Sequence, residues 1–248
     1  MENKELYLIL ADTTLILGQR LSEWCGHGPA IEEDIALSNV ALDYIGQATS
    51  LYKEICQREN NGKTEDDLAF LRDSSEYKNI LISELPNGDY AYTIARQFLF
   101  STWYGLYLEK LCHSKDAFLA GFAEKSIKEV RYHLQHSRDW VIRMGDGTEE
   151  SAQRVQNAIN EIWTFTGEMF HPSIAEKESI ENGIGVNVEE LLPKWNEIVE
   201  HTFSEAKLMV PADQWMQKGG KQGMHSEHFG FILAELQYLQ RAYPGAKW

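Results

Sequence analysis

The sequence has 248 residues and a formal net charge of −15. A chain of this length buries about three quarters of its unfolded surface, so its core needs no metal or disulfide to be stable. The excess of carboxylates argues against a nucleic-acid partner, because phosphate contacts need clustered Lys and Arg. Three cysteines, Cys25, Cys56 and Cys112, form no Cys-x-x-Cys pair, which predicts buried thiols in a reducing cytoplasm.

Apolar residues that recur every three or four positions, with only six prolines, predict helices nearly throughout. The apolar run 6–11 is interrupted by Asp12 and no cleavage site follows, so we expect neither a signal peptide nor a membrane span. The expected helices are 4–25, 31–57, 64–84, 89–113, 116–144, 149–170, 189–206 and 227–241, with an irregular stretch over 172–188. Long helices joined by short turns are typical of an antiparallel bundle. We therefore expect an all-α fold in a single domain, 1–248.

Capping and apolar patterns support several of these helices. Thr64 with Asp67, and Thr148 before two glutamates, are typical of helix starts. An apolar stripe marks the last helix: Phe229, Ile232, Leu233, Leu236 and Leu239. A second stripe marks 149–170: Val155, Ala158, Ile159, Ile162, Thr166, Met169 and Phe170. Both stripes are predicted to pack in the core.

The second and fifth predicted helices invite comparison with di-iron carboxylate bundles. In those bundles two helices each supply a Glu and the other two each supply Glu-x-x-His. Asp43 is the acid at the predicted inward position of the second helix, but Gly46 stands three residues later. Glu129 is its counterpart in the fifth helix, where Tyr132 stands at i+3 and His133 at i+4. One ligating histidine is therefore absent and the other is out of register.

Antiparallel packing predicts the residues that face these two acids. Counting back about thirty residues places Asp12 to Thr14 opposite Asp43, and Arg96 opposite Glu129. Because buried carboxylates without a metal need a countercharge, we hypothesise that Arg96 replaces the iron beside Asp43 and Glu129. Two alternatives remain open. Glu129 and His133 are an ordinary i, i+4 helix pair, or the chain is a di-iron or di-manganese oxygenase subunit with an unusual metal site of its own.

The glycine-rich segment 219–228 is a second candidate site. Its glycines and Lys221 lack the Walker spacing and no strand precedes them. His225 and His228 would share one face as zinc ligands, but the sequence offers no third ligand nearby. The alternatives are a loop in which Ser226 caps the last helix, or a loop that contacts a partner through Lys221, His225 and His228. A stand-alone hydrolase or binding module is least favoured, since no nucleophile motif is present.

Eight stretches together, in this order and spacing, resemble a known family. They are 20–27, 34–48, 85–89, 93–97, 127–133, 219–228, 237–241 and 244–248. Over essentially the whole chain the sequence resembles the C subunits of bacterial phenylacetyl-CoA 1,2-epoxidases, which are multicomponent ring-epoxidising oxygenases.

This resemblance implies a ferritin-like antiparallel helix bundle with extra C-terminal helices, located in the cytoplasm and paired with a homologous catalytic A subunit. In the family the A subunit holds the di-iron centre and binds the CoA thioester, and a reductase with FAD and an iron–sulfur cluster supplies electrons from NADPH. The C subunit is structural. The resemblance therefore implies no catalytic residue, metal or cofactor in this chain, and it identifies Asp43, Arg96, Glu129 and His133 as a vestigial di-iron centre.

Overall fold

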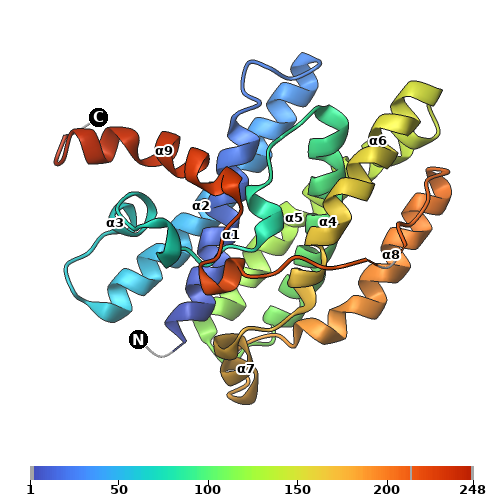
Figure 1. The fold of residues 1–248 in the computed structure, drawn as a ribbon. Helices are drawn as coiled ribbons and strands as arrows, with labels where there is room; N and C mark the ends of the chain where they lie inside the picture. The colour runs from blue at the N-terminus through green and yellow to red at the C-terminus, as the bar shows by residue number, and fades with distance from the viewer. Residues whose placement is uncertain (1–2, 213, 247–248) are drawn as a thin grey trace. The chain divides into compact units, whose positions relative to one another are not determined.

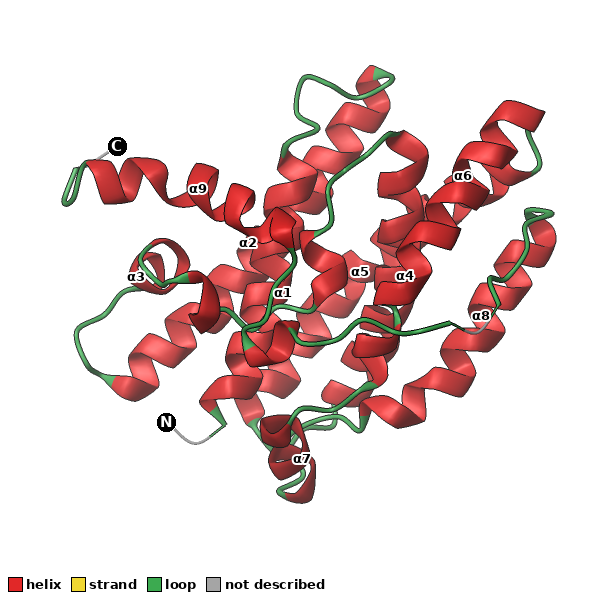
Figure 2. Ribbon diagram, viewed as in Figure 1, coloured by secondary structure: helices red, strands yellow, loops and turns green. Residues whose placement is uncertain are grey.

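The computed structural model describes residues 3–212 and 214–246, and all regular elements in these ranges are helical (Figure 2). The predicted all-α fold class is confirmed. The chain forms two compact units: the first holds residues up to Pro86 and those from Gly219 onward, and the second runs from Asn87 to Lys218. A single domain over 1–248 stays a prediction. Within the described ranges, no helix is both long and apolar enough to cross a membrane.

The first unit is built on a pair of long antiparallel helices (Figure 1). Its α-helices are α1 (Lys4–Ser22), α2 (Ile31–Glu59), α3 (Glu65–Phe70) and α9 (Glu227–Ala242). Lys4 forms an ion pair with Glu59 at 2.8 Å. Further along α1, a Cβ on Gly18 would lie 3.0 Å from Ile45 Cγ1 and 3.1 Å from the Ala41 carbonyl oxygen. Because glycine has no Cβ, α1 and α2 approach closely at this position.

Helix α3 is much shorter than the predicted helix 64–84. Its start is confirmed, because Thr64 and Asp67 form a capping box. The helix ends at Phe70, and the chain continues through 3-10 turns at Ser74–Glu76 and Leu81–Glu84. Arg72 explains the early end: its Nε donates to the Leu68 carbonyl at 2.6 Å, the carbonyl that a continuing helix would bond through the Arg72 backbone N–H.

The second unit contains the remaining α-helices. They are α4 (Tyr90–Leu111), α5 (Ala117–Gly145), α6 (Glu149–Ile162), α7 (Ile174–Glu181) and α8 (Leu192–Glu205). Helices α4 and α5 are antiparallel, with the Tyr90 ring 5.3 Å from the Trp140 ring and Gly105 beside Val130. Trp195 joins α8 to α4, since its Nε1 donates to the Leu99 carbonyl at 3.0 Å.

Several predicted boundaries of the second unit shift because 3-10 turns replace α-helical turns. Helix α6 ends at Ile162, yet the whole predicted stripe over 149–170 is buried. The stretch 172–188, expected to be irregular, contains α7. Ser173 and Glu176 form a capping box at the start of this helix. Helix α8 begins at Leu192 rather than 189, because a 3-10 turn precedes it and Pro193 occupies its first turn.

The three cysteines are free thiols, but the prediction that they are buried is wrong. Helix α1 ends at Ser22 rather than at residue 25, so Cys25 lies in an exposed turn. Cys56 and Cys112 are partly buried. Burial is the largest cause that raises the pKa of each of these two thiols.

Gly18→Val tests the close approach of α1 and α2. The added side chain would overlap Ile45 and the Ala41 carbonyl, so we expect a loss of about 1–3 kcal/mol in the free energy of unfolding, measured by urea denaturation. Gly46→Ala is the matched control on α2, because a Cβ there meets no atom within 4 Å. It should stabilise the helix by up to about 1 kcal/mol. Equal effects of the two substitutions would contradict the packing described.

Candidate functional site

The observed register of α1 and α2 differs from the prediction that Asp12 to Thr14 lie opposite Asp43. Gly18 lies beside Ala41 and Ile45, so the part of α1 next to Asp43 is near Gly18 rather than Asp12 to Thr14. Asp12 instead meets Tyr52, whose hydroxyl donates to Asp12 Oδ1. The six residues from Asp12 to Gly18 correspond to roughly 9 Å along the helix. The predicted facing positions, Asp12 to Thr14, were therefore wrong by between one and two helical turns.

Asp12 is fully buried and holds a second buried charge, Arg72. Both terminal guanidinium nitrogens of Arg72 donate to the carboxylate, with Nη1 at 3.0 Å from Oδ2. The Tyr52 hydroxyl and the Lys78 backbone N–H also donate to it. Four donors occupy the approximately four lone-pair sites of a carboxylate. Asp12 therefore has no free lone pair with which to bind a metal ion.

The residues around Asp43 do not form a Glu-x-x-His arrangement. Asp43 is partly exposed and Gly46 is exposed, whereas Tyr44 and Gln47 are the buried residues of this turn. A ligating histidine at the Gly46 position would therefore point away from the buried face of α2. Asp43, predicted at an inward position, is thus only partly buried.

The other three residues of the predicted centre, Arg96 on α4 and Glu129 and His133 on α5, differ in burial. Arg96 is fully buried, and its Nη2 donates to Asn87 Oδ1 at 2.7 Å. His133 is also fully buried, whereas Glu129 is only partly buried and Tyr132 is 52% exposed. The i+3 position is therefore on the outer side of α5, as it is on α2.

The register of α4 and α5 also differs from the prediction. Tyr90 meets Trp140 and Gly105 meets Val130, so Arg96 lies beyond Glu129 along the axis, toward the C-terminal end of α5. The hypothesis that Arg96 is the countercharge to Asp43 and Glu129 stays a prediction.

A di-iron centre would need a cluster of metal-ligating side chains. Within 3–212 and 214–246 no three His, Cys, Asp or Glu side chains come together in a group able to hold a metal ion. A di-iron bundle needs four carboxylates and two histidines around its two metals. The described part of the chain has long antiparallel helices, and the absence of a metal from this chain stays a prediction.

Comparison with known proteins gives the family. The model of the family described as "Phenylacetic acid catabolic protein" matches residues 2–248. The chain belongs to this family. It is 45% identical over 241 residues to the C subunit of the 1,2-phenylacetyl-CoA epoxidase from Escherichia coli (strain K12), covering 97% of each chain. The predicted family resemblance is therefore confirmed, and so is the ferritin-like class of the helical fold.

Within the first unit, the glycine-rich segment is held by a buried carboxylate that the sequence did not indicate. Glu84 is fully buried. Its carboxylate accepts hydrogen bonds from Asn79 Nδ2 at 3.0 Å and from the Ser226 backbone N–H at 2.5 Å, and it lies 2.9 Å from His225 Nδ1. Ser226 is the N-cap residue of α9, but its side chain makes no capping hydrogen bond. Its backbone N–H, rather than its hydroxyl, fixes the start of α9.

Lys221, His225 and His228 of this segment were predicted to contact a partner, and the two histidines were also weighed as zinc ligands. Both ring nitrogens of His225 lie against oxygens of the protein, Nδ1 at 2.9 Å from Glu84 and Nε2 at 3.2 Å from the Tyr77 carbonyl, so both positions through which the ring would bind zinc are already occupied. Lys221 is buried and His228 is partly exposed. The prediction of a partner-contacting loop stays a prediction, and His228 presents the most accessible of the three side chains.

Asp12→Ala tests the buried ion pair. Removal of the carboxylate leaves the Arg72 guanidinium buried without its countercharge, so we expect a loss of about 3–5 kcal/mol in unfolding free energy. Lys194→Ala removes an exposed pair with Glu197 and should change stability by less than about 1 kcal/mol. The double variant Asp12→Leu, Arg72→Met should recover most of the loss. A loss below that of Lys194→Ala would show that the pair is not structural.

The pH dependence of stability tests the two tyrosines beside this pair. Burial raises the pKa of Tyr77 to about 12, and burial followed by Asp12 raises the pKa of Tyr52 well above its usual range. The folded state then keeps protons that the unfolded state loses near pH 10, so this stability is fully present below about pH 10 and is lost above it. We expect the unfolding free energy to fall between about pH 10 and 12.

Tyr77→Phe should reduce that slope by up to about 1.4 kcal/mol per pH unit, measured by urea denaturation at several pH values. The comparison uses slopes, because the variant also loses the hydrogen bond from the Tyr77 hydroxyl to the Ala69 carbonyl at every pH. An unchanged slope would contradict the raised pKa.

Proposed function

We propose that this chain is a non-catalytic structural subunit of a multicomponent phenylacetyl-CoA 1,2-epoxidase in phenylacetate catabolism. Its role is to pair with the di-iron catalytic A subunit and hold the helices of that subunit in place. The observation that carries the proposal is the 45% identity, over 97% of both chains, to the C subunit of such an epoxidase. The exposed positions of Gly46 and Tyr132, where a di-iron bundle needs inward histidines, support a non-catalytic role.

An exposed apolar stripe on α2 is a suitable surface for this pairing. Ile31, Ile35 and Leu42 are 72%, 54% and 65% exposed. They follow one side of the helix at spacings of four and seven residues, which continue to the exposed Gly46. A glycine on such a stripe lets a second helix approach closely. Stable heteromeric interfaces are more hydrophobic than ordinary surfaces, and this stripe has that character.

The proposal assigns the redox chemistry to other components. The di-iron centre would lie in the catalytic A subunit, and NADPH, FAD and an iron–sulfur cluster would belong to the reductase. In this chain Asp43, Arg96, Glu129 and His133 would be the remains of a metal centre, with Arg96 as countercharge. Three free thiols without a disulfide support a cytoplasmic location.

Co-expression with the catalytic subunit of the same organism tests the proposal. We expect one complex on size-exclusion chromatography at micromolar concentration, with iron present in the complex and absent from this chain purified alone. Separate elution of the two proteins would refute the structural role. Stoichiometric iron or manganese in the isolated chain would instead favour the alternative, an oxygenase subunit with its own unusual metal site.

Substitutions on α2 test the pairing surface. Leu42→Glu places a charge in the proposed apolar contact, and we expect at least a tenfold weaker affinity for the catalytic subunit, measured by titration calorimetry. Met209→Glu is the matched control, because Met209 is also largely exposed, at 71%, but lies outside α2. Gly46→Leu should weaken pairing while it leaves the isolated chain folded. Equal affinity of all variants would place the interface elsewhere.

A further inference from the structure

Helix α9 has two apolar faces, of which only one is buried. Phe229, Ile232 and Leu233 are buried, on the side where α9 packs against α1 and α3. The predicted core stripe does not continue to Leu239, which is 45% exposed. Gln237 is the buried residue of that turn, because its Nε2 donates to the Arg72 carbonyl at 2.8 Å and to the Tyr77 hydroxyl at 3.0 Å.

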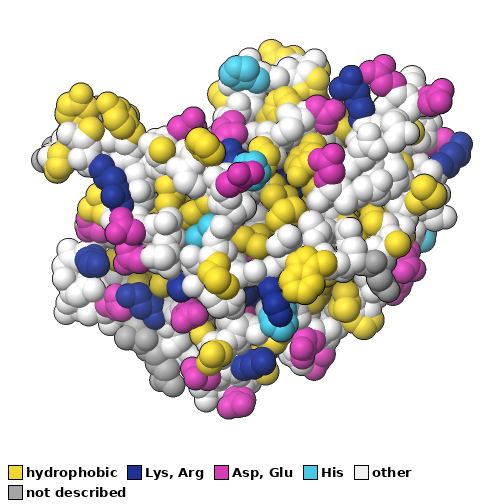
Figure 3. Space-filling model, viewed as in Figure 1, with side chains coloured by type: hydrophobic (Ala, Val, Ile, Leu, Met, Phe, Trp, Pro, Cys, Tyr) yellow, Lys and Arg dark blue, Asp and Glu magenta, His cyan; other side chains and the backbone are white. Residues whose placement is uncertain are grey.

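The outer face of α9 carries aromatic side chains in contact with solvent. Phe231 and Tyr238 are 70% and 63% exposed, and Tyr243, just after the helix, is 57% exposed. Exposed alanines at 234 and 242 continue the same face at helical spacing. In Figure 3 hydrophobic side chains gather over the outer end of α9. We call Phe231, Ala234, Tyr238, Ala242 and Tyr243 the α9 outer face.

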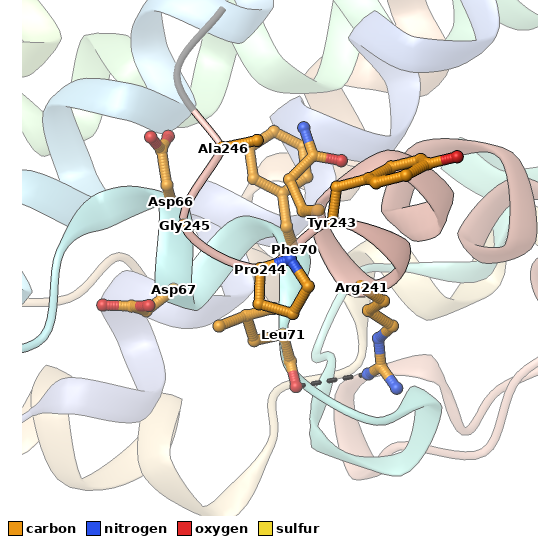
Figure 4. Close-up of a pocket in the computed structure, with 10 residues that line it drawn as sticks. Asp66, Asp67, Phe70, Leu71, Arg241, Tyr243, Pro244, Gly245 and Ala246 are labelled. Atoms are coloured by element: carbon orange, nitrogen blue, oxygen red, sulfur yellow. Dashed lines mark hydrogen bonds between the residues drawn. The ribbon is translucent and has the colours of Figure 1, made fainter.

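A pocket of about 650 Å³ opens beside the end of this face. Its apolar lining comes from Phe70 at the end of α3, from Leu71 just after that helix, and from Tyr243 and Pro244 of the C-terminal segment. Figure 4 shows the Asp66 and Asp67 carboxylates on one side of the pocket and Tyr243 on the other. Asp67 Oδ2 accepts from the Thr64 backbone N–H at 2.7 Å, whereas Asp66 is at the pocket without a capping role.

The charges around the outer face and the pocket are predominantly negative. Glu227 and Glu235 are exposed on α9, and Asp66 lines the pocket. Arg241, the cation among the described residues that line the pocket, is already bound to the Leu71 and Arg72 carbonyls and to Asp73. An occupant of this surface must therefore combine apolar side chains with positive charge. A second copy of this chain has the same acidic rim and a net charge of −15, so like charges oppose self-association.

We propose that the α9 outer face and its pocket dock an apolar segment flanked by Lys or Arg, belonging to an epoxidase component other than the catalytic subunit. The aromatic residues of the face contact the apolar side chains of that segment. A Lys or Arg of the segment enters the pocket with its stem along Phe70 and Pro244 and its charge at Asp66. This inference rests on the proposed function, since it presumes an epoxidase complex.

The size of the surface fits an anchoring contact. Aromatic side chains bury about 150–250 Å² each, and more than half of each of Phe231, Tyr238 and Tyr243 is exposed. Together they offer roughly 300–450 Å², which is about half of the approximately 800 Å² that each partner buries in a standard interface. The pocket adds depth and specificity to this area. An apolar patch of this size is comparable to the largest patch on a typical monomer, which is often functional.

The test uses the complex of this chain with its catalytic subunit. The other purified epoxidase components of the same organism are titrated onto it one at a time, by biolayer interferometry. We expect one component to bind, about thirtyfold more weakly to the Phe231→Ala complex and severalfold more weakly to the Asp66→Lys complex. Binding should also weaken when NaCl is raised from about 50 to about 500 mM.

Ile174→Glu is the matched control, because Ile174 is 79% exposed but lies on α7. It should leave the affinity unchanged, and circular dichroism should show that every variant is folded. The proposal would be overturned if none of the components binds the wild-type complex. It would also be overturned if the component that binds has equal affinity for the Phe231→Ala complex. Concentration-dependent self-association abolished by Phe231→Ala would overturn it too, because it would identify a second copy as the occupant. If the catalytic subunit itself does not bind this chain, the proposed function fails instead.

Discussion

The buried ion pair of Asp12 and Arg72 is the interaction on which the first unit depends. It joins α1 to the chain after α3, and Tyr52 brings α2 into the same cluster through a hydrogen bond to Asp12. The carbonyl of Arg72 then binds Gln237 and Arg241 of α9. Two opposite charges in a dry site stabilise each other only when both are present and all their hydrogen bonds are made. Four elements of the unit are therefore fixed by one pair.

The same pair bears on the chemistry of the chain. An acid on α1 that would be available to a metal in a di-iron bundle is here saturated by donors, and the positions three residues after Asp43 and Glu129 are exposed. The chain exposes apolar side chains on two separate helices of the first unit, α2 and α9. A structural subunit that contacts one component through each is a consistent account of both.

Local signals were enough to predict several elements. Thr64 with Asp67 forms the predicted cap because both groups lie within one turn, and the stripe over 149–170 is buried although part of it is not α-helical. The errors occur where distant residues intervene. Arg72 ends α3 by binding backbone carbonyls, and Gln237 replaces Leu239 in the core because Arg72 and Tyr77 lie beneath it.

The sequence by itself determined the helical class, the approximate helix positions and the family, since these follow from local periodicity and from motifs in a fixed order. It also showed that glycine and tyrosine, at 46 and 132, occupy the positions where a di-iron bundle has its two histidines. Only the tertiary structure decided which acid is neutralised and by what, because Asp12 and Arg72 are sixty residues apart and their pairing depends on how the connecting turns set the helix register. The exposed side of α9 was likewise decided by packing, because an apolar residue on a helix does not indicate whether its own chain covers it.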